Sequence, residues 1–226
     1  MKLAIVSDIH GNLAALEAVV ADLDQVRPDR VVHGGDLALN GPRPAECLAV
    51  VRERGWAGVR GNSDLAIWDR DSHSLPAGMV GIADWTKERL GDEHLSWLQT
   101  QPMEWRDGEA VALVHAVPGD VWEVVPAGAP DEQLRATYGP LGAQLAVYCH
   151  IHVPFVRHVG GLTVANTGSV GLPFDGDPRA AYLLVEDGTP TTRRVPYDLE
   201  RAIHDLHAAD HPAAARLEQT YREARM

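Results

Sequence analysis

The sequence predicts an α/β protein (α+β by some schemes) built as a four-layer αββα sandwich, in which two mixed β-sheets lie face to face with helices outside. Strand and helix patterns alternate over residues 3–60, which is typical of a parallel core. From Met103 onward, short strands follow one another at close spacing, which is typical of antiparallel hairpins. The length of 226 residues and a hydrophobic share of 45% suit a single domain spanning residues 1–226.

The N-terminal part provides the alternating elements. An apolar run from Leu3 to Val6 predicts a short buried strand. Asn12 is suited to cap the helix that follows, in which leucines and valines recur on one face. Pro44 is suited to the first turn of a second helix. The expected elements are strands 3–6, 30–36 and 56–60 and helices 12–23 and 45–54.

The remainder of the chain divides into a helical insertion, a strand-rich part and a helical tail. We expect residues 65–104 to form a peripheral helical insertion with a break at Gly91. Residues 197–226 are expected to form amphipathic helices packed on the outside. Glycine-containing turns separate several strands, which gives a mainly antiparallel second half. The expected strands are 103–106, 110–115, 145–150, 155–158, 162–165, 181–185 and 191–195.

Charge and cysteine content limit the partners. The formal net charge of −12 argues against binding an extended nucleic acid, but not against a small phosphorylated substrate held through divalent metals. Cys47 and Cys149 are the only cysteines, so we expect no disulfide framework and a reducing, cytoplasmic setting. We find no signal-peptide pattern and no membrane-length apolar run, and therefore expect no membrane partner. The oligomeric state stays open, with a homo-oligomer as one alternative.

Side chains that bind metals recur where the predicted strands end. Asp8 and His10 lie two residues apart after the first strand, and an extended backbone would point both into one cleft. Each residue taken alone is commonly a turn residue or a hydrogen-bonded histidine, but recurrence at successive strand ends favours a divalent metal site. The set is Asp8, His10, Asp36, Asn62, His115, His150, His152 and Asn166. We expect His73, His94, His158, His204, His207 and His211 at the surface or as caps.

This set resembles the calcineurin-like metallophosphoesterases, and within them the small single-domain phosphodiesterase branch of bacteria and archaea. The family's pattern runs Asp-x-His, Gly-Asp, Gly-Asn-His-Asp/Glu, His and Gly-His-x-His. The chain has, in the same order, Ser7-Asp8-Ile9-His10, Gly34-Gly35-Asp36, Gly61-Asn62-Ser63-Asp64, Val114-His115-Ala116 and Cys149-His150-Ile151-His152. The resemblance spans residues 3 to about 172 and includes Asn40-Gly41-Pro42.

The resemblance implies two divalent metal ions. It assigns one ion to Asp8, His10, Asp36 and His152, and the other to Asp36, Asn62, His115 and His150, so that Asp36 bridges them. A hydroxide bridging the two ions would attack phosphorus in line, because the ions lower its pKa and neutralise the phosphoryl oxygens. Mixed nitrogen and oxygen ligands suit Mn²⁺, Fe²⁺, Zn²⁺ or Ni²⁺ better than Ca²⁺ or Mg²⁺, and we take Mn²⁺ as the expected ion.

Two positions depart from the family's pattern. Ser63 stands where the family has a histidine that assists the leaving group, and because serine is a poor general acid, this favours activated or anhydride substrates. Cys149 replaces a glycine, and we expect its thiol to pack inward. Asp64 is expected to orient a histidine ligand or the Asn62 loop. The catalytic candidates are therefore Asp36, Asn62, Ser63 and Asp64.

The implied activity is that of a dinuclear-metal phosphoesterase, foremost a phosphodiesterase or a nucleotide-type phosphohydrolase. The alternative is a catalytically weak metal-binding scaffold or protein-interaction module of the same fold, such as the retromer subunit, but every matching position here carries a competent ligand. A nuclease fits poorly with the acidic charge. Specificity is expected in residues 65–104 and the 172–177 loop. Candidate substrate contacts are Asn12, Arg43 and Asn62, while Arg60, Arg157 and Arg179 are either phosphate contacts or ion-pair partners.

Overall fold

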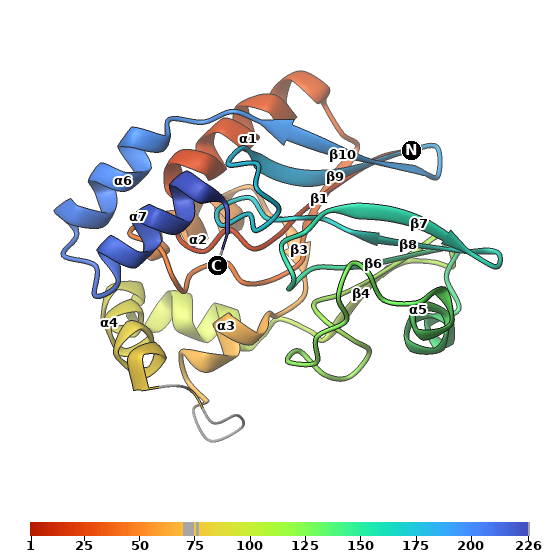
Figure 1. The fold of residues 1–226 in the computed structure, drawn as a ribbon, viewed down its shortest axis with the longest axis horizontal. Coiled ribbons are helices and arrows are strands. Elements are labelled where there is room, and N and C mark those ends of the chain that lie inside the picture. The colour runs from red at the N-terminus through yellow and green to blue at the C-terminus, as the bar shows by residue number, and fades with distance from the viewer. Residues whose placement is uncertain (70–74, 76, 226) are drawn as a thin grey trace.

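The protein is a sandwich of two five-stranded sheets with helices on the outer faces, which confirms the expected αββα class (Figure 1). A computed structural model describes residues 1–69, 75 and 77–225, and His73 lies outside them. The first sheet has the order β10-β9-β1-β2-β3 and the second the order β4-β5-β6-β8-β7. The strands are β1 (Lys2–Val6), β2 (Arg30–His33), β3 (Ala57–Gly58), β4 (Glu104–Asp107), β5 (Val111–Val114), β6 (Leu145–Tyr148), β7 (Phe155–Val159), β8 (Leu162–Asn166), β9 (Ala180–Glu186) and β10 (Thr189–Val195).

The helices occupy the outer layers. Asn12 caps the first of them, because its side chain accepts a hydrogen bond from the amide of Ala15, and Gly91 breaks the longest one with a φ of 70°. None of the helices in the described part of the chain is long and apolar enough to cross a membrane. The helices are α1 (Leu13–Val26), α2 (Pro44–Glu53), α3 (Asn62–Ala66), α4 (Ala77–Gln99), α5 (Asp131–Tyr138), the 3₁₀-helix η1 (Gly139–Leu141), α6 (Leu199–Ala208) and α7 (Ala214–Glu223).

The two sheets differ in how well the strand spacing predicts their pairing. In the first sheet, β1 pairs in parallel with β2 and β2 with β3, as the alternating pattern predicts, and β9 and β10 add two antiparallel strands. In the second sheet, β5 pairs in parallel with β6, and β6 with β8, so only the two edge strands run antiparallel. The expectation of a mainly antiparallel second half was therefore wrong for the centre of this sheet.

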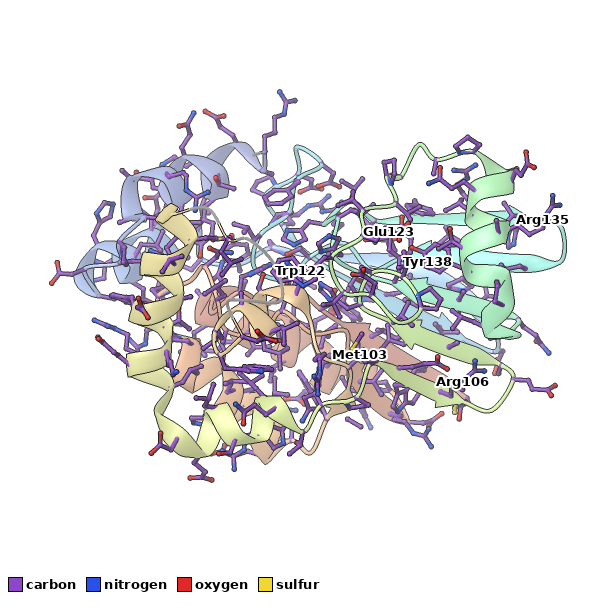
Figure 2. All side chains as sticks on the ribbon, turned by 90° about the horizontal axis from the view of Figure 1, so that it is seen from below. Met103, Arg106, Trp122, Glu123, Arg135 and Tyr138 are labelled. Atoms are coloured by element: carbon purple, nitrogen blue, oxygen red, sulfur yellow. The ribbon has the colours of Figure 1, made fainter. Side chains whose placement is uncertain are left out.

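The parallel pairing of β5 and β6 requires a crossover connection, which α5 provides. The strand-based expectation omitted this helix, although its sequence carries a signature. Acidic residues occupy its first turn, and Leu134 and Tyr138, four residues apart, are its buried residues. Figure 2 shows Tyr138 and Arg135 on opposite sides of α5. The Tyr138 hydroxyl donates to the carbonyl of Ala116, and its ring stacks on Tyr148, so α5 is tied to the second sheet.

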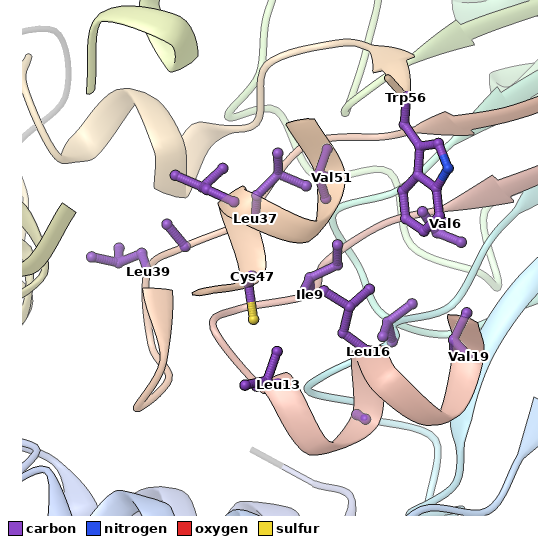
Figure 3. Close-up of a cluster of buried hydrophobic side chains, with 14 of the residues drawn as sticks. Val6, Ile9, Leu13, Leu16, Val19, Leu37, Leu39, Cys47, Val51 and Trp56 are labelled. Atoms are coloured by element: carbon purple, nitrogen blue, oxygen red, sulfur yellow. The ribbon is translucent and has the colours of Figure 1, made fainter. Parts of the chain in front are cut away.

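Buried hydrophobic clusters hold the layers together. Between the sheets, Leu3 and Ile5 of β1 pack in one cluster with Leu113 and Val147 of the second sheet. Outside the first sheet, side chains of α1 and α2 pack on Val6, as Figure 3 shows. The segment expected as a peripheral insertion belongs in part to this same core, because its residues Ile82, Leu90 and Leu98 are buried there.

Residues that follow strands of the two sheets make a close contact where Cys149 faces Gly34. A Cβ atom at position 34 would lie 2.1 Å from the sulfur of Cys149 and 2.8 Å from the Cβ of Ser7. Cys149 is fully buried, which confirms that its thiol packs inward. The sulfur of Cys149, where the family's pattern has glycine, thus occupies the space that a side chain at position 34 would need.

We expect Gly34→Ala to destabilise the fold by about 1–3 kcal/mol, because the added methyl group overpacks this contact. Cys149→Gly in the same chain should recover a large part of that loss, since it removes the sulfur that the methyl group meets. Urea unfolding of the wild type, both single variants and the double variant gives the coupling energy. Additive losses in the double variant would contradict the contact.

His211, expected at the surface or as a cap, is buried in the α6–α7 connection, where it packs on α4. Its ring packs edge-on against Trp85 at a centroid distance of 4.6 Å, and the amide of Ala213 donates to its Nδ1 at 3.1 Å. Burial, with smaller contributions from Arg216 and Arg89, lowers the pKa of His211 to about 4. The neutral ring therefore helps to dock the C-terminal helices on α4.

This burial predicts a pH-dependent stability. An unfolded histidine has a pKa of about 6.5, so between about pH 6.5 and 4 the unfolded chain binds more protons at position 211, and stability falls as the pH falls. His211→Asn keeps an acceptor for Ala213 but does not titrate. The wild type should lose on the order of 1 kcal/mol more than this variant between pH 7 and pH 5 in urea unfolding. His204→Asn, at an exposed position of α6, is the control, and equal losses in the wild type and His211→Asn would exclude this role.

Candidate metal centre

The predicted metal ligands meet at the carboxyl ends of the parallel strands in both sheets. The loop after β1 and the loop after β2 run side by side. The amide of Asp8 donates to the carbonyl of Gly35 at 3.0 Å, and the amide of His10 donates to the carbonyl of Asp36 at 2.9 Å. These hydrogen bonds hold the two loops together and bring their carboxylates and imidazole to one place.

Five of the seven predicted ligands have a left-handed backbone. The φ angles are 52° at Asp8, 49° at His10, 55° at Asp36, 67° at His150 and 57° at His152. Non-glycine residues seldom adopt this conformation, and it persists where the surrounding structure holds it in place. The expectation that an extended backbone pairs Asp8 with His10 was therefore wrong. Tight loops, rather than strand alternation, aim these side chains at one another.

Four of these side chains form one compact group. One ligand atom each from Asp8, His10, Asp36 and His152 lies within 4.8 Å of all the others, and all four residues are buried. The Nε2 of His152 is 3.2 Å from Oδ1 of Asp8 and 3.2 Å from Nε2 of His10. The Nε2 of His10 is 3.6 Å from Oδ2 of Asp36. This group is the set that the resemblance assigns to the first ion.

Backbone carbonyls fix the proton on three of the histidines. A carbonyl oxygen only accepts, so the Nδ1 that faces it is the donor, and the neutral ring presents a lone pair at Nε2. Imidazole lone pairs and carboxylate oxygens thus converge, and a divalent cation is the partner that such a donor set fits. The Nδ1 atoms of His10, His115 and His152 donate to the carbonyls of Leu39, Gly34 and Leu172 at 2.7, 2.7 and 2.5 Å.

The remaining predicted ligands gather around Asn62, the first residue of α3. Its Oδ1 lies 2.8 Å from Nε2 of His115 and 2.9 Å from Nδ1 of His150. The Nε2 of His115 is also 3.6 Å from Oδ1 of Asp36. Asp36 therefore lies between both groups, with one carboxylate oxygen toward each, which is where a bridging ligand is required.

Ser63 holds the carboxylate of Asp36. Its amide donates to Oδ1 and its hydroxyl donates to Oδ2, both at 2.8 Å. The backbone also approaches closely, because a Cβ at Gly61 would lie 1.9 Å from Oδ1 of Asp36, so glycine is required there. The Ser63 hydroxyl is thus committed to a carboxylate rather than presented to a leaving group.

Asp64 anchors the backbone of the loop that carries Asp36. Its buried carboxylate accepts hydrogen bonds from the amides of Asp36, Leu37 and Gly61 at 2.8, 2.9 and 3.2 Å. Burial, together with the charge of Asp36, raises the pKa of Asp64 to about 7. Asp64 does not line the cavity described below, and it acts on the site by fixing the backbone that carries Asp36.

Electrostatics keep most of the ligand set unprotonated. Burial lowers the pKa of His10, and burial with the neighbouring His115 lowers the pKa of His150 to about 4. Burial alone would raise the pKa of Asp8, but His152 and the other histidines outweigh it and lower the pKa well below its usual range. Burial lowers the pKa of His152, but the carboxylate of Asp8 more than offsets burial, so the pKa of His152 is raised above its ordinary value. Asp8, His10 and His150 are therefore in the form that binds metal.

A cavity of about 290 Å³ opens onto the ligand group. Its described wall includes the predicted residues His10, Asp36, Asn62, Ser63, His150 and His152, together with Asn40. Met79 of the 65–104 segment and Leu172 and Phe174 of the 172–177 loop also line it, in the two segments where specificity was expected. The Phe174 ring stacks on His152 at a centroid distance of 4.4 Å. The sequence analysis did not predict that Arg216, Leu217 and Thr220 line the cavity, because it placed the amphipathic tail on the outside of the fold.

Other predicted contacts lie elsewhere in the structure. Asn12 is fully buried, and its Nδ2 donates to the carbonyl of Gly171 while its Oδ1 caps α1. Arg43 donates to Glu46 at 2.7 Å and is not part of the described cavity wall. Asn166 holds the histidine-bearing loop after β6 by donating to the carbonyl of Cys149. Arg60, Arg157 and Arg179 bind backbone carbonyls or aspartates.

The fold and this site define a metallophosphoesterase, and residues 1–188 match the family model of the calcineurin-like phosphoesterase superfamily domain. The chain belongs to this superfamily. It is 30% identical to the uncharacterised protein MJ0912 of Methanocaldococcus jannaschii, over 90% of this chain and 91% of that protein. The crystal structure of a metallophosphoesterase from Sphaerobacter thermophilus is 29% identical and superposes with a TM-score of 0.83, covering 99% of both chains.

A shorter similarity connects the chain to an enzyme with a named substrate. The symmetrical bis(5'-nucleosyl)-tetraphosphatase of Methylococcus capsulatus is 32% identical over 134 residues, which are 54% of this chain and 45% of that protein. The chain thus matches less than half the length of that enzyme.

We expect Asp64→Asn to destabilise the protein by about 2–3 kcal/mol, because an amide offers one acceptor oxygen where the carboxylate receives three N–H groups. Its NH₂ group would also face a backbone N–H. Thermal and urea unfolding measure the loss. Asp92→Asn, at an exposed position of α4, should stay within about 0.5 kcal/mol of the wild type. A loss at position 64 no larger than at position 92 would refute the anchoring role.

Proposed function

We propose that the protein is a divalent-metal-dependent phosphoesterase that acts as a phosphodiesterase or a nucleotide-type phosphohydrolase. The observation that carries the proposal is the convergence of imidazole lone pairs and carboxylates at one wall of the cavity, with carbonyls holding the protons of His10, His115 and His152 on the far side of each ring. Membership of the superfamily supports hydrolysis at phosphorus. The similarity to a bis(5'-nucleosyl)-tetraphosphatase supports a nucleotide-type substrate.

Two ions, with Mn²⁺ first among the candidates, would be held by the two groups that share Asp36. Asp8, His10, Asp36 and His152 would hold one ion, and Asp36, Asn62, His115 and His150 the other. When bound, such ions neutralise the oxygens of a phosphoryl group and lower the pKa of water toward neutrality. Nitrogen and oxygen donors in this mixture suit Mn²⁺, Fe²⁺, Zn²⁺ or Ni²⁺.

The chain's own residues orient the substrate and shape its surroundings. Asn40 lines the cavity in a left-handed conformation, and its buried Oδ1 has no hydrogen-bond partner among the described residues. It is placed to accept a hydrogen bond from a substrate hydroxyl or from water. The side chains of Leu172 and Phe174 exclude water from part of the cavity, which strengthens the electrostatic interactions inside.

The remaining properties of the chain support a small substrate in a reducing compartment. The net charge of −12 disfavours an extended nucleic acid, which would need a basic surface. Both cysteines are buried and unpaired, which supports a cytoplasmic setting.

Asp36→Asn should abolish both the binding of metal and turnover, because an amide cannot supply the negative charge between two cations. We would strip the protein of metal, reload it with Mn²⁺, and measure bound metal together with hydrolysis of bis-p-nitrophenyl phosphate and p-nitrophenyl phosphate. Mn²⁺-dependent release from the diester, with little from the monoester, is the result expected of a phosphodiesterase without the family's histidine at position 63.

The outcomes separate the alternatives. Asp92→Asn should keep the metal content and activity of the wild type. Two metals bound without release from either ester would direct the search to a narrow anhydride-type substrate. Activity that survives Asp36→Asn would refute the bridging role, and a wild-type protein that binds no metal would overturn the proposed function.

A further inference from the structure

The helix α7 forms part of the cavity wall, although it lies beyond the residues that match the family model. Arg216, Leu217 and Thr220 of α7 line the same cavity as the metal-ligand group. Figure 1 shows α7 beside α6, and Arg216 also lines a second cavity with Gly78 and Met79 of α4. Since the model of the family domain ends at residue 188, this wall is a feature of the C-terminal extension rather than of the shared domain.

Arg216 is the one arginine or lysine among the described residues that line this cavity. Its guanidinium has no ion pair or side-chain hydrogen bond within residues 1–69, 75 and 77–225. Arg222 on the same helix differs, because it pairs with Glu200 and Glu218. The hydroxyl of Thr220 donates to the carbonyl of Arg216 at 3.1 Å, so the guanidinium is the polar donor that α7 offers to a ligand.

The surroundings of Arg216 suit the binding of an anion. Met79 and Leu217, which line the cavity with it, are apolar, while Arg216 itself is an exposed residue of α7, so its guanidinium is accessible to a ligand. A guanidinium binds phosphate oxygens through two parallel hydrogen bonds, with greater geometric specificity than a lysine. A second phosphate on the substrate is therefore the ligand that this arginine fits best.

Ser63 supports the same substrate chemistry from a separate observation. Its hydroxyl donates to Asp36, so the position that carries a histidine in the family presents no proton to a leaving group here. A substrate whose leaving group is a stable anion needs no such proton. A phosphate that departs from a phosphoanhydride meets this requirement, whereas an alkoxide does not.

We propose that Arg216 is a specificity-determining residue that binds the departing phosphate of a phosphoanhydride substrate. The proposal rests on the proposed function. In the reaction, water adds its oxygen to the reacting phosphorus, the bond from that phosphorus to the bridging oxygen breaks, and the bridging oxygen keeps the electron pair. The departing phosphate carries the new negative charge, which Arg216 pairs, and the proton of the water passes to solvent. The cavity of about 290 Å³ is suited to the two phosphates, with a larger substituent extending into solvent.

The test compares two probes that the enzyme cannot hydrolyse, methylenediphosphonate and methylphosphonate, which differ by the second phosphonate. Their dissociation constants are measured by calorimetry on Mn²⁺-reloaded wild type, Arg216→Gln, Arg216→Lys and Arg222→Gln. Arg216→Gln should raise the dissociation constant of methylenediphosphonate at least about 10-fold and that of methylphosphonate less than about 2-fold. Arg216→Lys should recover part of the loss, and Arg222→Gln should behave as the wild type.

A diphosphonate chelates the metals more strongly than a monophosphonate does. This difference is the same in all four proteins, because their metal ligands are identical, and it therefore cancels when each variant is compared with the wild type. Equal weakening of both probes by Arg216→Gln, or no weakening of either, would overturn the proposal. Hydrolysis of bis-p-nitrophenyl phosphate distinguishes a failure of the Arg216 proposal from a failure of the proposed function. That ester has no second phosphate, so its turnover by the wild type and by Arg222→Gln, which lies outside the cavity wall, tests the metal chemistry independently of Arg216.

Discussion

The site depends on hydrogen bonds that backbone carbonyls accept from histidine rings. Leu39, Gly34 and Leu172 each hold one Nδ1 proton; Gly34 and Leu39 lie in the loop between β2 and α2, and Leu172 lies in the loop between β8 and β9. Each bond fixes both the orientation of a ring and the place of its proton, so the lone pairs of three imidazoles point inward. Without the close approach of the loops after β1 and β2, the carbonyls and rings would not meet. The architecture of the sandwich thus sets the protonation pattern of the ligands.

Asp36 shows how the fold fixes a carboxylate at a shared position. Asp64 anchors its backbone through buried hydrogen bonds, and Ser63 holds both of its oxygens. This support matters because a left-handed aspartate next to several buried ionisable groups is unfavourable in isolation. Ser63, at the position where the family has a histidine, therefore holds the Asp36 carboxylate in place.

The C-terminal helices connect stability with specificity. α6 and α7 pack on each other around Leu206, Leu217 and Tyr221, and His211 docks them on Trp85 of α4. The same docking places Arg216 and Leu217 in the wall of the cavity. A change in this packing would alter the shape of the cavity without touching a metal ligand. The packing of the C-terminal helices and the shape of the cavity are therefore linked in this fold.

The sequence by itself determined the class of fold, the first sheet's parallel strands and the collinear set of metal-binding residues, because these follow from local periodicity and from residues at strand ends. It also indicated that Cys149 packs inward. Only the tertiary structure decided the parallel centre of the second sheet, because the strand-based expectation omitted α5, which connects β5 to β6. The tertiary structure also decided that Arg216 lines the cavity, whereas Asn12 and Arg43 are not part of its described wall. Periodicity tells which face of a helix is buried, but the loop conformations and the docking of distant helices decide what that face meets.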